Sequence, residues 1–200
     1  KIKWIQLEST GFAEYSEVKI NFLKNDVIIT NLKSFFARQV AQTTLAGILS
    51  FYRGTDLFAS LKKEKTWVGD PIRNKLEILN NKKVLFFGKG SINKEVSKYL
   101  KPFDCKCSFI DSHSTKEYIL NKLRLAEIII CALPGTKRTK MLFNKKMLET
   151  FSKHSILVNV GRGDLIDENH LIEKLKNKTL RGAVLDVTSE EPLQKNNKLW

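Results

Sequence analysis

The 200-residue chain has few cysteines and no long hydrophobic run. Its three cysteines, Cys105, Cys107 and Cys131, cannot build a disulfide framework, and the CKC stretch lacks a second pair of ligands for zinc. We therefore expect reduced cysteines in a cytoplasmic protein, and no metal site. The longest apolar stretches, such as EIIICALPG, are far too short to span a bilayer, so no membrane association is expected.

Arginine is also scarce, although the net charge is +14. The chain has 28 lysines and only 7 arginines, and the lysines are scattered rather than gathered in one stripe. Specific recognition of phosphates and bases depends strongly on arginine forks and clustered basic surfaces. We therefore expect no nucleic-acid partner, and a nucleic-acid-binding protein is kept only as a minor alternative.

From about residue 83 onward, short apolar runs alternate with segments of helical spacing. Helices are expected where the apolar spacing fits, and Pro102 should end the first of them. Strands that are apolar throughout favour a parallel sheet covered on both faces, which is a doubly wound α/β fold. A ligand should then lie beyond the carboxyl ends of the strands. The expected strands are KVLFF, CKCSFI, EIIICAL, SILVNV and GAVLDV.

The first eighty residues follow a different pattern. Two strands are expected, in KIKWIQLEST and in DVIITN. One long helix is expected over 34–52, with Ser34 as its N-cap and a broad apolar face that is a candidate dimer surface. A looser second helix and a loop should follow it.

The stretch GKGSINKEV directly follows the first apolar strand and opens a helix. Gly88 and Gly90 stand at the first two positions of a G-x-G-x-x-G turn, and Asn93 replaces the third glycine. A pyrophosphate should lie on the helix N-terminus near Ser91 and Ile92. Because the third glycine serves helix packing, Asn93 should shift the helix slightly without closing the phosphate site.

Asp111 ends the next strand, at the position of the acid that binds a ribose 2′-hydroxyl in such domains. A carboxylate there would repel a 2′-phosphate, so NAD is predicted in preference to NADP. A surface acid after an unrelated strand is the alternative interpretation.

The segments LPGTKRTKMLFN, ILVNVGRGDLIDENHLIEKL and GAVLDVTSEEPL follow one another with a characteristic spacing. Over residues 82–200 they resemble the D-isomer-specific 2-hydroxyacid dehydrogenases. The resemblance implies a Rossmann-type NAD-binding domain over 33–200, with an interdomain helix at 34–52 and a core at 82–200. Residues 1–32 would be the remnant of a second, substrate-binding domain. Where the family usually has Val-Ala-Glu, this chain has Val40-Ala41-Gln42.

The resemblance also implies roles for individual residues. Arg162 would bind the substrate carboxylate and polarise the keto oxygen, and Glu191, with Glu190 as a rival, would hydrogen-bond a catalytic histidine. Thr10 and Gly11 would contact the substrate through their backbone. The implied cofactor contacts are Gly88, Gly90, Ser91, Ile92, Asp111, Leu133, Pro134, Val160, Gly161, Arg162 and Asp186.

The catalytic histidine of the family has no counterpart here. His113, His154 and His170 stand at unsuitable positions, and His170 is expected on a helix surface. The chain also begins at Lys1 rather than methionine, so we expect a fragment of a longer enzyme that acts on a small 2-hydroxy or 2-keto acid, as a homodimer in its full length. The alternative is a noncatalytic, NAD-sensing protein on the same fold, similar to the family's corepressor relatives.

Overall fold

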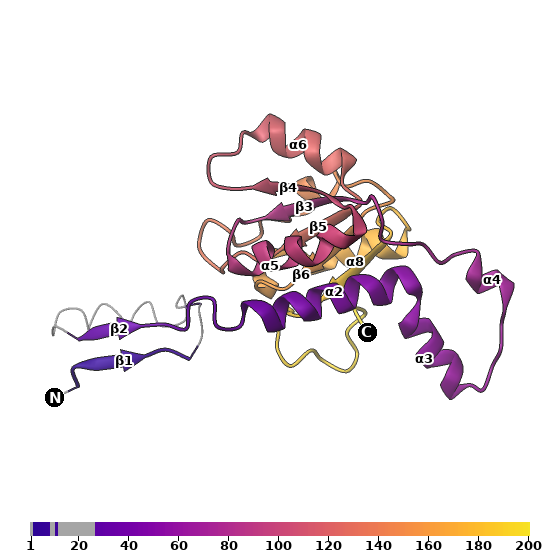
Figure 1. Cartoon of the computed structure of the whole chain (residues 1–200), viewed down its shortest axis with the longest axis horizontal. Coiled ribbons are helices and arrows are strands. Elements are labelled where there is room, and N and C mark those ends of the chain that lie inside the picture. Colours follow the sequence, from indigo (N-terminus) through magenta and orange to yellow (C-terminus); the bar gives the residue numbers. More distant parts are fainter. Residues whose placement is uncertain (1, 9–10, 12–26) are drawn as a thin grey trace.

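The computed structural model describes residues 2–8, 11 and 27–200, and its centre is a sheet of five parallel strands (Figure 1). The strand order is β4-β3-β5-β6-β7, with every neighbouring pair parallel. This confirms the doubly wound α/β fold. The strands are β3 (Lys83–Phe87), β4 (Lys106–Ile110), β5 (Ile128–Cys131), β6 (Ile156–Asn159) and β7 (Gly182–Leu185).

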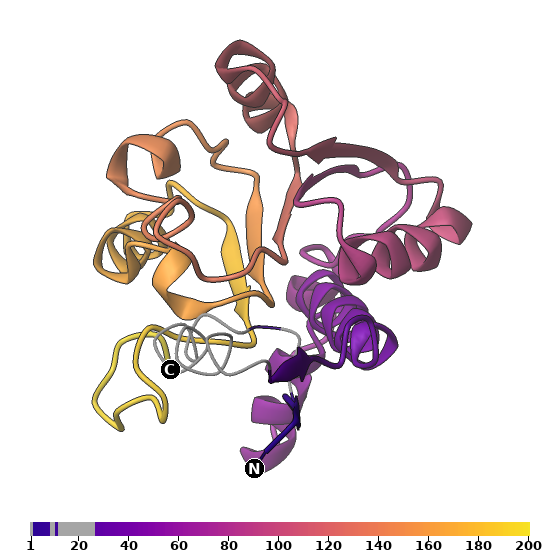
Figure 2. The same cartoon turned by 90° about the vertical axis from the view of Figure 1, so that its left-hand side faces the viewer.

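Helices cover both faces of the sheet because its central strands are apolar on both sides. In β5, Ile128 and Ile130 pack into one buried cluster, and Ile129 and Cys131 pack into the other. The first cluster includes side chains of α2 (Ala37–Arg53) and α5 (Ser91–Leu100). The second includes side chains of α6 (Lys116–Leu125), α7 (Lys145–Leu148) and α8 (Glu168–Lys176). Figure 2 shows α7 and α8 on the opposite side of the sheet from α2 and α5.

The strand order reverses beside β3, which lies between β4 and β5. The chain builds outward to β4 and then returns past β3 to build β5, β6 and β7 on the other side. Loops that leave the carboxyl ends of neighbouring strands diverge at such a point and leave a crevice between them. The turn at Gly88 follows β3 directly, so it lies at this point of the sheet.

The long helix predicted over 34–52 is confirmed as α2, but its predicted N-cap is wrong. The helix begins at Ala37, and Phe36 occupies the N-cap position without a side-chain hydrogen bond. Ser34 instead has a left-handed backbone (φ 68°) and accepts the Ala37 N–H through its carbonyl oxygen at 3.1 Å. A turn therefore precedes the helix where the serine hydroxyl was expected to begin it.

Strands β1 (Trp4–Gln6) and β2 (Ile28–Thr30) form a separate two-stranded parallel sheet. The assignment of residues 1–32 to a second domain stays a prediction. After α2, an arm made of α3 (Thr55–Lys63) and α4 (Asp70–Arg73) extends from the domain (Figure 1). Within the described residues, no helix is long and apolar enough to cross a membrane.

Candidate cofactor and substrate site

The turn between β3 and α5 has the geometry of an anion-binding turn. Gly88 has φ 94°, a conformation that favours glycine, and its N–H donates to the Ile110 carbonyl at 2.9 Å. A Cβ atom at Gly88 would lie 2.9 Å from Cδ2 of Leu133, whereas one at Gly90 would have nothing within 4 Å. The space beside Gly90 is therefore open at the start of α5, where helix N–H groups and the helix dipole favour an anion.

Asn93 lies directly under this turn. Its side chain is buried, and Nδ2 donates to the carbonyl oxygens of Phe87 at 2.9 Å and Gly88 at 2.8 Å. The residue was expected to act only as a spacer between helix and strand. The structure shows that it also hydrogen-bonds the backbone of the turn.

Asp111 lies at the carboxyl end of β4, one strand away from the turn, and is exposed. Its Oδ1 accepts the backbone N–H of His113 at 3.0 Å and the Ser114 hydroxyl at 3.2 Å. The His113 N–H, then the Ser114 hydroxyl and the nearby ammonium of Lys89, hold the pKa of Asp111 below its usual value. The carboxylate is therefore ionised, and no hydrogen bond to its Oδ2 comes from the described residues.

The loops after β5 and β6 lie against each other. A Cβ atom at Gly161 would lie 2.5 Å from the Leu133 carbonyl oxygen, so glycine is needed for this approach. Val160 is buried and donates its N–H to the Cys131 carbonyl, while Pro134, which follows Leu133, is exposed. Leu133 thus touches both the Gly88 turn and the Gly161 turn, which brings separate predicted cofactor contacts together.

Asn159 organises the turn that carries Arg162, and sequence reasoning did not single it out. Its buried side chain accepts the Gly161 N–H at 3.1 Å and donates to the Arg162 carbonyl at 2.8 Å. Its position as a polar residue at the end of an otherwise apolar strand was the available signal.

Arg162 is half-buried and is enclosed by glycines from three segments. Its Nη1 donates to the Gly161 carbonyl at 2.9 Å, and a Cβ atom at Gly135 would lie 3.2 Å from its Cγ. A Cβ atom at Gly11 would lie 2.5 Å from its Nη2. The structure therefore joins two predicted substrate contacts, Gly11 and Arg162, that are 151 positions apart in the sequence. Thr10 lies outside the described residues.

The loop after β7 passes close to Arg162. The N–H of Asp186 donates to the Asn159 carbonyl at 3.0 Å, and a Cβ atom at Gly163 would overlap the backbone of Thr188 and Ser189. Within the loop, Glu191 accepts the Thr188 N–H at 3.0 Å.

Glu168, at the start of α8, fastens this loop to the domain. Its two carboxylate oxygens accept the backbone N–H and the hydroxyl of Ser189, each at 2.6 Å. Glu190 instead accepts the side-chain amide of Gln194 at 2.8 Å. Sequence reasoning missed the contact between Glu168 and Ser189 because it joins residues 21 positions apart.

The histidines lie elsewhere. His113 and His154 are exposed, and the expectation of a surface position for His170 is wrong. The His170 ring is buried, with Nε2 2.6 Å from Glu149 and Nδ1 3.1 Å from Glu173. In the part of the chain that the structure describes, no histidine hydrogen-bonds Glu191, and no cluster of His, Cys, Asp and Glu could hold a metal ion.

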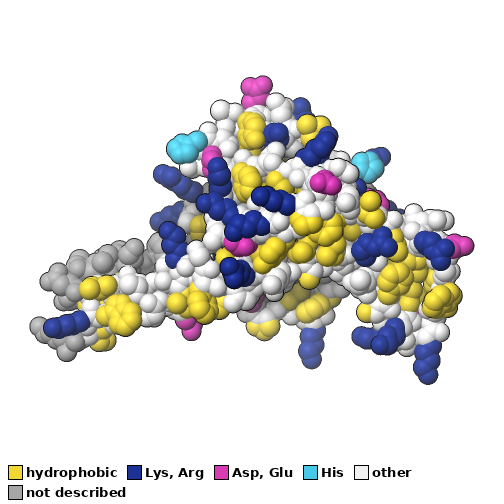
Figure 3. Space-filling view, viewed as in Figure 1, with side chains coloured by type: hydrophobic (Ala, Val, Ile, Leu, Met, Phe, Trp, Pro, Cys, Tyr) yellow, Lys and Arg dark blue, Asp and Glu magenta, His cyan; other side chains and the backbone are white. Residues whose placement is uncertain are grey.

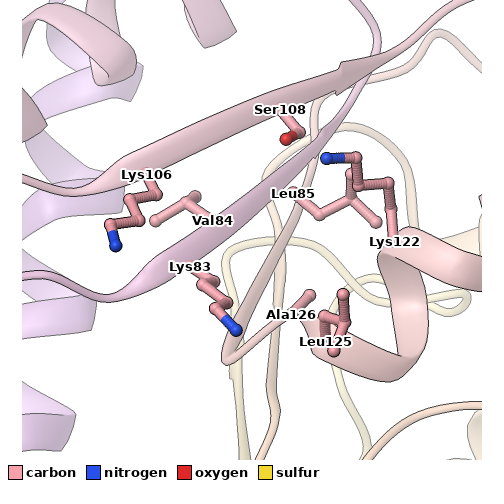
Figure 4. Close-up of a pocket in the computed structure, with 8 residues that line it drawn as sticks. All are labelled: Lys83, Val84, Leu85, Lys106, Ser108, Lys122, Leu125 and Ala126. Carbon is pink, nitrogen blue, oxygen red and sulfur yellow. The ribbon is translucent and has the colours of Figure 1, made fainter.

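A pocket of about 180 Å³ lies at the opposite, amino-terminal side of the sheet (Figure 4). It is bounded by the first residues of β3 and β4, Lys83 and Lys106, and by Lys122 on α6. None of the predicted site residues lines it. Apart from Thr10 and Gly11, the predicted site residues instead follow the carboxyl ends of β3, β4, β5, β6 and β7.

Residues 45–200 match the family model of the D-isomer specific 2-hydroxyacid dehydrogenase, NAD binding domain. The chain belongs to this family. Membership confirms the resemblance in the motifs, and the matched region is the family's NAD-binding domain.

Curated relatives and solved structures agree with this assignment. The chain is 30% identical over 173 residues to a D-lactate dehydrogenase of Streptococcus pyogenes serotype M1, covering 82% of this chain and 52% of that protein. It is 31% identical over 182 residues to a glyoxylate/hydroxypyruvate reductase of Arabidopsis thaliana, covering 84% and 54%. The chain thus spans about half the length of these two dehydrogenase-family relatives.

A glyoxylate reductase from Paecilomyes thermophila has the same fold, with a TM-score of 0.85 at 18% identity over 98% of this chain and 63% of that one.

Proposed function

We propose that this chain is the NAD-binding part of a dehydrogenase that transfers a hydride between the nicotinamide ring and C2 of a small 2-hydroxy or 2-keto acid. Family membership supports the reaction class, and the arrangement of the carboxyl edge supports the placement of the site. NAD bound at this edge would supply or accept the hydride.

The predicted cofactor contacts follow the strand order, which supports an extended dinucleotide across the sheet. Asp111 on β4 would bind the adenosine ribose, and the turn from Gly88 to Ile92 after β3 would bind the pyrophosphate. The open space at Gly90 fits a phosphate group. The nicotinamide end would lie near the loops after β5, β6 and β7, formed by Leu133, Pro134, Val160, Gly161 and Asp186.

The observation that carries the proposal is the position of Arg162 beside Gly11. The guanidinium is a permanent cation with a planar fork, suited to binding a carboxylate with two hydrogen bonds. Its contact with Gly11 supports a second set of contacts from the backbone of that residue, so a bound acid would be held from both sides. The same cation would stabilise negative charge that develops on the keto oxygen.

Proton transfer to that oxygen requires an acid, and we propose a histidine held by Glu191. Among the described residues, none of the three histidines hydrogen-bonds Glu191. We therefore place the donor in residues other than these 200, within the longer protein that the relatives' lengths suggest.

The test uses the full-length protein, assayed for NADH formation with D- and L-isomers of small 2-hydroxy acids. Arg162→Gln should lower kcat/KM by about a hundredfold or more, because a charge that stabilises the transition state is lost. Arg124→Gln, on the exposed side of α6, is the matched control and should be active. Full activity of Arg162→Gln, or no NADH formation with any of these acids, would contradict the proposal.

The noncatalytic alternative has no support from the two curated relatives above, which are a dehydrogenase and a reductase. We also propose a cytoplasmic location, supported by the three free cysteines.

We further propose a homodimer, for which the expected surface on α2 stays a prediction. Within α2, Ala41, Ile48 and Tyr52 are buried in the domain, whereas Leu45 and Leu49 are only half-buried. Exposed apolar side chains also gather over α3 and α4 (Figure 3), around a groove of about 800 Å³ that Phe58 and Trp67 help to line. Trp67 is 96% exposed, so a second copy is the proposed cover. Sedimentation should detect a dimer that Trp67→Ser weakens, and a monomeric wild type would contradict this.

A further inference from the structure

Asn93 presents an amide where the G-x-G-x-x-G motif has its third glycine. The side chain is 1% exposed, and Nδ2 donates to the carbonyl oxygens of Phe87 and Gly88 at 2.9 and 2.8 Å. The reverse orientation of the amide would set its oxygen against two carbonyl oxygens. The hydrogen bonding therefore fixes which way the amide points.

These two bonds determine which backbone groups the turn presents. In a trans peptide the C=O and the N–H point in opposite directions, so the Gly88 carbonyl held by Asn93 turns the Lys89 N–H away from it. Both bound carbonyls are kept under the turn, away from the open space at Gly90. A carbonyl oxygen that rotated into that space would repel an anion, whereas N–H groups attract one.

Stability alone does not account for the amide. Oδ1 of Asn93 is buried and has no hydrogen-bond partner among residues 2–8, 11 and 27–200. An unpaired buried acceptor is unfavourable, and glycine at this position would avoid it. The donated bonds, in contrast, act on the turn that follows β3.

We propose that Asn93 is a positioning residue for the phosphate-binding turn, and that its amide takes over part of the role of the missing glycine. In the motif, glycine lets the helix approach the strand. Here the amide fills that contact and fixes the peptide planes of the turn. The inference rests on the proposed function, since it assumes that the turn holds the pyrophosphate of NAD.

The test is calorimetric titration of the protein with NADH, ADP and adenosine. Asn93→Ala should weaken NADH and ADP about tenfold, because two bonds that orient the turn are lost, and should leave adenosine affinity unchanged. The matched control is Ser155→Ala. It removes a buried side-chain bond to the Ala126 carbonyl (2.6 Å) at the amino end of β6, and should leave all three affinities unchanged.

Two further variants keep the outcome decisive if Asn93→Ala does not fold. Asn93→Gly restores the residue of the motif, and Asn93→Asp keeps the shape without the donors; both should lose affinity for NADH and ADP. Wild-type affinity for NADH in any folded variant of Asn93 would overturn the inference, and so would an equal loss for adenosine, which has no phosphate. A wild type that binds neither NADH nor ADP would instead refute the proposed function, and the inference would fall with it.

Discussion

Replacing Gly163 with alanine should destabilise the domain, because the loop after β7 runs directly against this glycine. A Cβ atom there would overlap the carbonyl carbon and oxygen of Thr188 and the backbone nitrogen of Ser189. The φ of Gly163 is not in the left-handed region, so alanine meets no conformational strain of its own. The expected effect is therefore purely steric.

The size of this destabilisation depends on which atoms would have to move to make room for the new Cβ atom. Inserting atoms into a well-packed site costs about 1–3 kcal/mol, and the smaller values arise where a side chain can rotate away. Here backbone atoms are in the way, and Glu168 also holds Ser189 by two hydrogen bonds. We expect a loss of about 3 kcal/mol, which for a chain of this size lowers Tm by roughly 6–12 °C.

Thermal and urea unfolding, followed by circular dichroism, measure this loss. Gly90→Ala is the matched control, since a Cβ atom at Gly90 has nothing within 4 Å and its backbone is extended (φ −75°, ψ −178°). It should change stability by less than about 0.5 kcal/mol. If Gly163→Ala were as stable as Gly90→Ala, the close packing of the loop against Arg162 and Gly163 would be refuted.

Three further predictions concern other contacts. Asp111→Ala should narrow the preference for NADH over NADPH about tenfold in parallel titrations, and an unchanged ratio would count against a ribose contact. Glu168→Gln and Ser189→Ala should each lower the free energy of unfolding by about 1 kcal/mol, a figure already reduced for the exposure of both side chains. The double variant should lose less than the sum of the two single losses, and a loss equal to that sum would argue against the contact. The pKa of Glu149 is lowered chiefly by its hydrogen bond to His170, so its contribution to stability is present above about pH 4.5 and is lost as the pH falls below. In Glu149→Gln the free energy of unfolding should therefore fall less steeply below about pH 4.5 than in the wild type. An equally steep fall in both proteins would contradict this.

The sequence allowed the sheet to be predicted because each strand is a short apolar run that ends in a turn. The stretch EIIICAL is an example, and Ile128–Cys131 within it form the fully buried strand β5. Periodicity also located α5 and α8. A proline follows α5, and acidic residues stand at the start of α8, so both helices carried a signal for one of their ends.

Contacts between distant segments could not be predicted in the same way. Nothing local distinguishes a surface histidine from His170, whose ring is hydrogen-bonded to Glu149 at the end of α7. The hydrogen bonds of Asn93 and Asn159 depend likewise on the path of the backbone around each turn. Ser34 has the chemistry of an N-cap, but its left-handed backbone is incompatible with that role.

Titration of the wild-type protein and of Gly90→Val with NADH tests most directly whether the dinucleotide lies on the turn before α5. Because the Gly90 position is open and its backbone suits any residue, valine should leave Tm unchanged while it fills the space assigned to the pyrophosphate. We predict that the wild type binds NADH and that Gly90→Val loses this binding. Equal NADH affinity in a folded Gly90→Val protein would contradict the central claim, as would a wild type that does not bind NADH.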